Sequence, residues 1–238
     1  MGIIDWTKRR LHRDIVADPL LHARVLNLYL NGEAYPHRVD DYFPVAHVES
    51  PELAARMRVH MDDEDKHIAL YAKAIEKLGQ VVEDLPHACI FNAVIRQHTP
   101  ESWAVRAGQD RQTQRLRLAH FFAHAHCLEK RVARSLEMHL DACAHAASPY
   151  PAKAVGAVLA DEYDHVRYTA EAVDDLLPRA VAQEVWKVHT VAEKRANLDF
   201  SSAQLKRLLR ENRTSWPSSR RAYYRACSAA MRGLLSHA

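Results

Sequence analysis

Two short segments with the same order of residues could bind a metal ion. The sequence DEDKH at residues 63–67 and the sequence DEYDH at residues 161–165 each place a histidine three residues after a glutamate. Residues three apart share one face of an α-helix, so each segment presents a carboxylate and an imidazole in the same direction. Both groups are common metal ligands. The alternative is that both segments form exposed helical ion pairs, which contribute little to stability.

Two further glutamates fall where a metal site on these helices would need them. In an antiparallel helix hairpin, residues equally far from the turn lie level with each other. Glu33 and Glu64 are 31 residues apart, with their midpoint at an expected turn near residue 48. Glu129 and Glu162 are 33 residues apart, with their midpoint at a second expected turn near residue 145. Glu137 is the rival of Glu129, but it lies about two helical turns, roughly 12 Å, away from that level.

Long helices must position these residues, and the hydrophobic periodicity predicts an all-α chain. The four helices expected to carry the ligands cover about residues 19–42, 51–79, 109–146 and 151–177. Pro36 should kink or break the first of them. The connector over residues 80–108 is too long for a hairpin turn and should contain a short helix over about 86–97 and a helix start at 99–101.

The remaining segments complete three predicted parts of the chain. Residues 1–18 form an N-terminal segment, residues 19–177 form the four-helix domain, and residues 178–238 add helices packed on it. In the last part, we expect one helix from Pro178 to about Asn197 and two shorter ones that begin near residues 201 and 216.

The complete set of candidate ligands consists of Glu33, Glu64-x-x-His67, Glu129 and Glu162-x-x-His165. This set resembles the pattern of the ferritin-like di-iron carboxylate superfamily, in its oxidase and oxygenase branch. The resemblance implies a four-helix bundle with one long crossover that holds two iron ions. It implies that Glu33 and His67 are terminal ligands of one ion. Glu129 and His165 would be terminal ligands of the other, with Glu64 and Glu162 as bridges. Manganese, or a mixed Mn/Fe pair, would suit the same ligands.

Asp63 and Asp161, which precede the two motif glutamates, add to the resemblance. A metal-bound histidine usually donates its other N–H to a carboxylate. A similar Asp-Glu-x-x-His motif in bacterial multicomponent monooxygenases supplies that carboxylate across the helix pair. Those enzymes usually carry Arg where this chain has Lys66 and Asp164, and Thr where it has Ala133. The chain therefore departs from that subgroup while keeping the ligand set.

Two more residues are candidates for the site. Tyr71 follows His67 by four residues, a place similar to that of the radical-forming tyrosine in ribonucleotide reductase small subunits; the alternative is a core tyrosine. His126 lies one turn before Glu129 and could be an extra ligand or a proton carrier, or else an ordinary histidine. The residues expected to line a substrate cavity are Leu26, Leu30, Met57, Met61, Phe122, Val132, Val158 and Thr169.

Composition narrows the class of protein. With 238 residues, 48% of them hydrophobic, the chain can bury a sizeable core. It has no apolar run of membrane-spanning length and no apolar segment of a secretory signal near its N-terminus, which predicts a cytoplasmic protein. The four cysteines form no Cys-x-x-Cys pair, which excludes a zinc ribbon or a rubredoxin-type site.

The C-terminal residues 206–238 are strongly basic, with eight Lys or Arg against one Glu, and Trp216, Tyr223 and Tyr224 lie between them. Such a region could bind RNA, an anionic lipid or an acidic redox partner. The alternative is a solvated helical face whose apolar side packs on the bundle.

Together, these patterns predict a non-heme di-iron oxidase or oxygenase that uses O₂ to oxidise a small organic molecule. Amine N-oxygenases and aldehyde deformylating oxygenases both remain open within that class. An external electron donor is expected, because no reductase module is present, and the C-terminal helices could form a homodimer. Three alternatives remain: a ferroxidase resembling bacterioferritin, a tRNA-hydroxylase-like enzyme that uses the basic C-terminal region, and a binding bundle without metal.

Overall fold

Every regular element in the described part of the chain is a helix, so the prediction of an all-α protein is confirmed. The computed structural model describes residues 2–38, 43–99, 104–144, 146 and 148–237. The α-helices in these residues are α1 (Ile3–Ile15), α2 (Pro19–Glu33), α3 (Tyr35–Arg38), α4 (Pro51–Lys77), α5 (Phe91–Gln97), α6 (Arg111–Cys143), α7 (Tyr150–Leu176), α8 (Arg179–Glu211) and α9 (Ser218–Leu235). Two short 3-10 helices, η1 (Val45–His47) and η2 (His87–Cys89), precede α4 and α5.

Side-chain caps set the starts of three helices that carry candidate ligands. Asp18, Ser50 and Asp110 each accept N–H groups from the first turn of α2, α4 and α6 respectively. Pro19 and Pro51 occupy the first helical position, where the missing N–H would have had no partner. Each side-chain cap contributes about 1 kcal/mol. Local sequence is therefore sufficient to begin these helices.

The first expected helix is shorter than its hydrophobic pattern indicates. It ends at Glu33, and the next turn forms the separate helix α3, which contains Pro36. The proline ring excludes a continuous helix, so the break falls one turn before it. Residues 39–42 lie outside the described part of the chain. The helix start expected at 99–101 falls largely on residues 100–103, which also lie outside it.

The chain after Pro178 forms one long helix and one shorter helix, rather than three. The expected break near Asn197 is absent, because α8 continues to Glu211. Ser202, which was expected at a helix start, lies inside α8 with its hydroxyl 3.0 Å from that of Ser228 on α9. This interhelical contact satisfies the hydroxyl without ending the helix.

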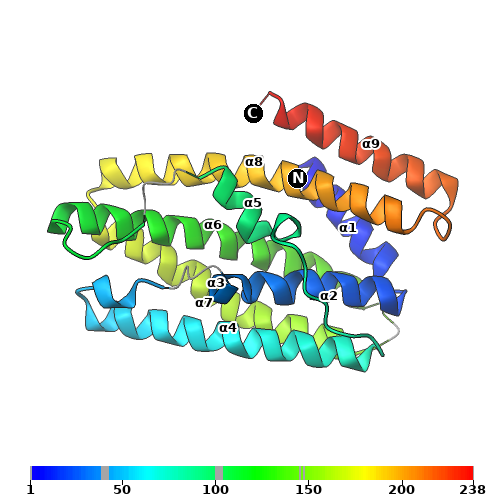
Figure 1. Cartoon of the computed structure of the whole chain (residues 1–238), viewed down its shortest axis with the longest axis horizontal. Coiled ribbons are helices and arrows are strands. Elements are labelled where there is room, and N and C mark those ends of the chain that lie inside the picture. Colours follow the sequence, from blue (N-terminus) through cyan, green and yellow to red (C-terminus); the bar gives the residue numbers. More distant parts are fainter. Residues whose placement is uncertain (1, 39–42, 100–103, 145, 147, 238) are drawn as a thin grey trace.

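The four helices with candidate ligands lie side by side in the order α2, α4, α7, α6 (Figure 1). On the other side of α6 lie α1 and α8, and α9 packs on α8. The N-terminal segment is therefore itself a helix that covers α6. A cavity lies between α2 and α6, and α1, α5 and α8 contribute much of the rest of its wall.

Two asparagines hold the connector between the two halves of the chain along α2. The side-chain oxygen of Asn27 accepts the N–H of Glu83 at 2.8 Å, and that of Asn31 accepts the N–H of Leu85 at 2.9 Å. The asparagines are four residues apart and share one face of α2. The connector is thereby kept in an extended path that leads to α5.

The aromatic residues of the basic C-terminal region pack inward. Trp216 and Tyr224 are buried, and the Tyr224 hydroxyl donates to Asp14 on α1 at 2.7 Å. The exposed basic residues of this region include Lys206, Arg210, Arg213, Arg225 and Arg232. The region therefore packs its apolar side on the molecule and exposes its charges, as the solvated-face alternative predicts.

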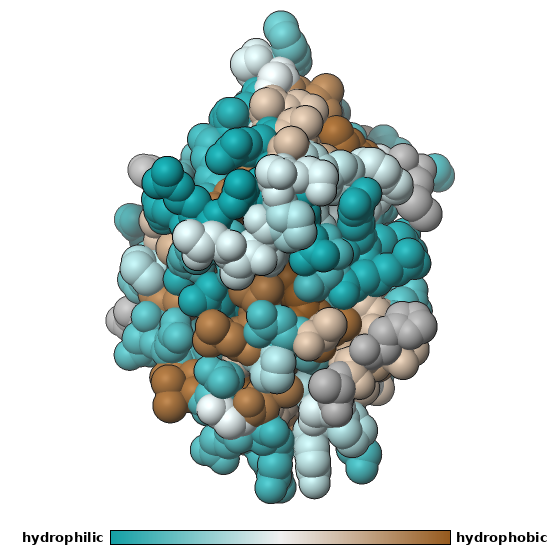
Figure 2. All heavy atoms as spheres, turned by 90° about the vertical axis from the view of Figure 1, so that its right-hand side faces the viewer, coloured by the Kyte–Doolittle hydropathy of each residue, from teal (hydrophilic) through white to brown (hydrophobic). Residues whose placement is uncertain are grey.

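Hydrophilic side chains cover most of the end of the molecule where α8 turns into α9, while hydrophobic ones gather in its middle and lower parts (Figure 2).

Among the described residues, none of the helices combines the length and hydropathy that a membrane span requires.

Candidate metal centre

The structure brings all six predicted ligands together, from four different helices. They are Glu33 of α2, Glu64 and His67 of α4, Glu129 of α6, and Glu162 and His165 of α7. They form two groups, in each of which one ligand atom per residue lies within 4.8 Å of the others. One group is Glu33, His67 and Glu162; the other is Glu64, Glu129 and His165, joined by His60. The spacing and burial suit metal ions, and the role of each residue as a ligand remains a prediction.

The two groups adjoin each other through their carboxylates. Burial raises the pKa of Glu33, and the charge of Glu64 and a hydrogen bond to it raise that pKa further. Burial likewise raises the pKa of Glu162, and the charge of Glu129 adds to the effect. Glu64 of one group therefore lies against Glu33 of the other, and Glu162 against Glu129. This is where bridging carboxylates would have to lie.

The buried charges are not balanced by the protein alone. Burial and the charge of Glu129 raise the pKa of Glu64 to about 8. Burial also acts to raise the pKa of Glu129, but the hydrogen bond and charge of His60 outweigh it and lower that pKa to about 2. Such opposite shifts arise because closely spaced carboxylates cannot all ionise without cations. Divalent cations would remove this conflict.

Two buried ligand atoms also lack partners. The Nδ1 atom of His67 and the Oε1 atom of Glu162 have no hydrogen-bond partner among the described residues. They lie 3.7 Å apart, beyond a normal hydrogen bond. Buried polar atoms are almost always satisfied. The orphaned pair therefore fits the two sides of a metal ion.

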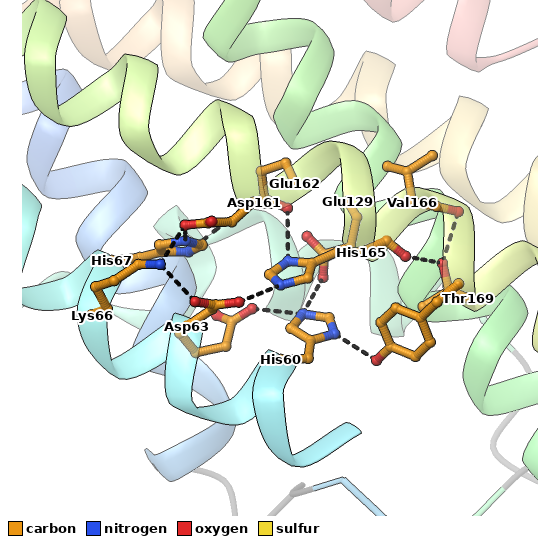
Figure 3. Close-up of polar contacts among 12 residues, drawn as sticks. His60, Asp63, Lys66, His67, Glu129, Asp161, Glu162, His165, Val166 and Thr169 are labelled. Carbon is orange, nitrogen blue, oxygen red and sulfur yellow. Dashed lines mark hydrogen bonds and ion pairs between the residues drawn. The ribbon is translucent and has the colours of Figure 1, made fainter. Parts of the chain in front are cut away.

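Each motif histidine meets the aspartate of the other motif (Figure 3). The Nε2 atom of His67 lies 3.2 Å from Asp161, and the Nε2 atom of His165 lies 3.4 Å from Asp63. The Nδ1 atom of each ring therefore faces the buried carboxylates. In His165 this atom lies 3.3 Å from Glu162. In this cross-helix arrangement each aspartate could fix the orientation of the other motif's imidazole, as carboxylates do for metal-bound histidines.

Lys66 joins the two aspartates and was not identified from the sequence as part of the site. Its Nζ atom lies 2.6 Å from Asp63 and 2.7 Å from Asp161 (Figure 3). Burial raises the pKa of Asp63, but the hydrogen bond and charge of Lys66 outweigh it, so the pKa is lowered overall. The lysine therefore favours the charged form of Asp63 and links the two aspartates that face the histidines.

His60 is a further candidate ligand, which was not predicted from the sequence. Its Nε2 atom lies 2.9 Å from Glu64 and 3.5 Å from Glu129, and its Nδ1 atom lies 2.6 Å from the Tyr168 hydroxyl. Its ring stacks on that of His165, with centroids 3.6 Å apart. The available signal was the spacing, because His60 precedes Glu64 by four residues and so shares its helix face.

The two additional candidates differ in position. Tyr71 is fully buried, and burial together with the charges of Glu33 and Glu162 raises its pKa, so it adjoins the carboxylates. His126 belongs to neither group. Its Nδ1 atom donates to the carbonyl of Val166 at 3.0 Å, away from the candidate ligands.

Glu137, the rival of Glu129, lies at the surface of α6. Its carboxylate pairs with Arg134 at 2.8 Å and accepts from the Tyr163 hydroxyl at 3.2 Å. The structure therefore places Glu129, rather than Glu137, with the other ligands.

A third buried group could also hold a metal ion. It contains His22, His139 and Cys143, from α2 and α6. The Nε2 atoms of the two histidines lie 2.8 Å apart, and burial lowers the pKa of His22 to about 4. Two neutral imidazoles can share one hydrogen bond at this distance. None of these three residues is among the ligands predicted from the sequence.

A cavity of about 210 Å³ reaches the candidate metal centre from one side. Glu33, Glu64 and Glu129 form part of its wall. Of the residues expected to line a substrate cavity, only Val132 does so; the others pack elsewhere, and Met57 for example is fully buried in the core. Most of those residues do not line this cavity because they pack in the interior of the four helices, whereas the cavity opens between α2 and α6.

Comparisons with protein-family models, with curated proteins and with solved structures found no match for this chain. The chemistry of the site must therefore be inferred from its residues.

Proposed function

We propose that this protein is a non-heme di-iron oxidase or oxygenase with a ferritin-like bundle formed by α2, α4, α6 and α7. The connector between α4 and α6 would be its long crossover. The observation that supports this proposal most directly is the convergence of four carboxylates and three imidazoles in two adjoining buried groups. Surface ion pairs would not require this burial, and an unmetallated bundle would leave its carboxylates in conflict.

The residues divide naturally between two metal ions. Glu33 and His67 would hold one ion, and Glu129 with His165 and His60 would hold the other, as the two groups indicate. Glu64 and Glu162 would lie between them. Two ferrous ions held by these residues would supply the reductive activation of O₂ for attack on an organic substrate.

The protein's own residues support this chemistry in three ways. Asp63 and Asp161 orient the imidazoles, and Lys66 forms ion pairs with both aspartates. Burial of the carboxylates excludes bulk water from the reacting groups. The cavity brings a substrate to the side of the centre formed by Glu33, Glu64 and Glu129.

This cavity favours an oxygenase over the two enzymatic alternatives. A ferroxidase needs a path for ions, whereas the cavity wall is mainly apolar. A tRNA hydroxylase would be expected to offer aromatic side chains for base stacking. The aromatic residues Trp216 and Tyr224 of the basic region are buried instead.

The first test is metal content, measured by plasma mass spectrometry on protein produced in iron-supplemented medium. We expect about two iron ions per chain and O₂ consumption by the reduced protein. The double variant Glu64→Gln and Glu162→Gln should lose the metal, while the surface variant Glu137→Gln should retain it. Only a trace of iron and manganese, persisting after anaerobic addition of ferrous ion to folded protein, would overturn the proposal.

A further inference from the structure

Polar side chains from α1 and α6 meet on one part of the cavity wall. Lys8 and His12 are four residues apart on α1, and Arg131 and Ser135 are four residues apart on α6. Each pair shares a helix face, and all four residues line the cavity. The Nζ atom of Lys8 donates to the hydroxyl of Ser135 at 2.9 Å, which shows that the two faces are in contact.

Both cations on this part of the wall lack a carboxylate partner. Among the described residues, no carboxylate lies within 4.0 Å of the charged atoms of Lys8 or Arg131. Arg131 donates to the side-chain oxygen of Asn197, and its guanidinium lies 4.0 Å from the ring centroid of Phe91. Neither contact neutralises its charge.

The nearest acids act on these cations only over longer distances. Glu193 and Asp5 raise the pKa values of both Lys8 and Arg131 through their charges. Burial has the larger effect and disfavours the charged form of both side chains. An incompletely paired buried cation is costly, and an anion that enters the cavity would offset that cost.

His12 offers a further donor beside the cations. It is buried, and its Nδ1 atom has no hydrogen-bond partner within the described structure. Burial lowers the pKa of His12 to about 3, and the charge of Lys8 contributes. The imidazole is therefore neutral at neutral pH and can donate one N–H to a ligand.

The rest of the cavity wall is largely apolar. Leu28, Leu128, Val132 and Phe121 are among its members, and an inorganic anion would leave this surface without a partner. Apolar surface favours an apolar ligand body, at about 25 cal/mol for each Å² removed from water.

We propose that the cavity binds a small organic acid, with its carboxylate held by Lys8, Arg131 and His12. Its apolar body extends past Val132 toward the buried glutamates. This inference deepens the proposed function, on which it rests for naming a carboxylic acid as the substrate class. The binding of the acid itself requires no metal ion.

The dimensions of the cavity limit the size of the acid. Its volume of about 210 Å³ is below the range of about 300–1,000 Å³ that is typical of sites for drug-sized ligands. The Nζ atom of Lys8 contacts Ser135, which lies six residues beyond Glu129 on α6, roughly 9 Å along the helix axis. An acid held by its carboxylate would therefore present a carbon atom of its chain to the candidate metal centre.

Octanoate is a suitable probe for this site. Isothermal titration at neutral pH would use the full-length chain freed of metal by a chelator, because carboxylates also bind iron directly. Octan-1-ol of the same chain length and inorganic phosphate would serve as separate ligands. We expect octanoate to bind at least about tenfold more tightly than octanol, because charge-assisted hydrogen bonds hold the carboxylate. Phosphate should show no binding.

Variants of the two cations test the assignment of residues. We expect Lys8→Met to weaken octanoate binding by about tenfold or more. The same variant should raise the melting temperature of the ligand-free protein, because it removes a half-buried cation that has no carboxylate partner. Arg131→Gln should also weaken octanoate binding. Lys130→Met, at an exposed position beside Arg131 on α6, is the matched control and should change neither property.

Three results would overturn the proposal: equal affinity for octanoate and octanol, phosphate binding as tight as that of octanoate, or unchanged octanoate affinity in both cation variants. Iron content measured on the same preparation, before the chelator is added, separates this proposal from the proposed function. Octanoate binding by protein that contains no iron would support the acid site and contradict the proposed oxygenase function. Bound iron together with no octanoate binding would contradict the acid site but not the proposed oxygenase function.

Discussion

The Nε2 atom of His67 on α4 lies 3.2 Å from the carboxylate of Asp161 on α7. His165 on α7 and Asp63 on α4 repeat this relationship in the opposite direction, at 3.4 Å. Each motif therefore presents its own imidazole to the buried carboxylates and holds the imidazole of the other motif. The two copies of the motif form a single site, and they can do so only because α4 and α7 lie side by side.

Asp161→Asn should weaken metal binding while leaving the ligands in place. Loss of a carboxylate that orients a metal-bound histidine typically lowers affinity about 10–100-fold. Anaerobic titration with ferrous ion would measure the change. Asp164→Asn is the control, because Asp164 is exposed and pairs with Arg167 at the surface. Equal affinities in the two variants would contradict a role for Asp161 in orienting His67.

His60→Gln should weaken the binding of one of the two metal ions more than that of the other. His60 contacts Glu64 and Glu129 in one group only, so its loss should lower the affinity of that position by about tenfold or more. The same ferrous titration would then show two separated phases. His126→Gln, which alters a histidine outside both groups, should leave the titration unchanged. A single unaltered phase in His60→Gln would remove His60 from the ligand set.

Tyr71→Phe should stabilise the metal-free protein. The Tyr71 hydroxyl is buried without a partner among the described residues, and removing such a group relieves about 1–3 kcal/mol of desolvation cost. Urea unfolding monitored by circular dichroism would show a higher midpoint. Tyr224→Phe is the opposite control, because it deletes a hydrogen bond to Asp14 and should lower stability. A lower midpoint in Tyr71→Phe would mean that its hydroxyl is satisfied.

Stability should fall as the pH is lowered from about 6.5 toward 3. Burial lowers the pKa values of His12, His124 and His189 to about 3. Below pH 6.5 the unfolded chain therefore binds protons that the folded chain does not, which favours unfolding. Each histidine should cost about 2 kcal/mol between pH 6.5 and pH 5.

Urea unfolding of chelator-treated protein at pH 7.5 and pH 5 would measure this loss. His124→Gln should reduce the loss of stability by about 2 kcal/mol. The exposed His237→Gln should not change it. An equal loss in His124→Gln and in the native chain would show that His124 is protonated in the folded protein.

The sequence by itself determined where several of the helices begin and which residues of neighbouring helices lie level with one another. Asp18, Ser50 and Asp110 begin helices through contacts with residues no more than a few positions away. Such local interactions can be predicted from neighbouring residues in the sequence. The choice of Glu129 over Glu137 followed from counting residues across a hairpin, because the rise of a helix per residue is constant.

Only the tertiary structure decided which side chains meet between helices. Spacing shows which residues share a helix face, but the rotation of each helix about its axis depends on packing against its neighbours. Lys66 joins Asp63 to Asp161 across α4 and α7, and Lys8 reaches Ser135, 127 positions away, to form the polar wall of the cavity. No local pattern contains these contacts, because they arise from the fit of whole helices to one another.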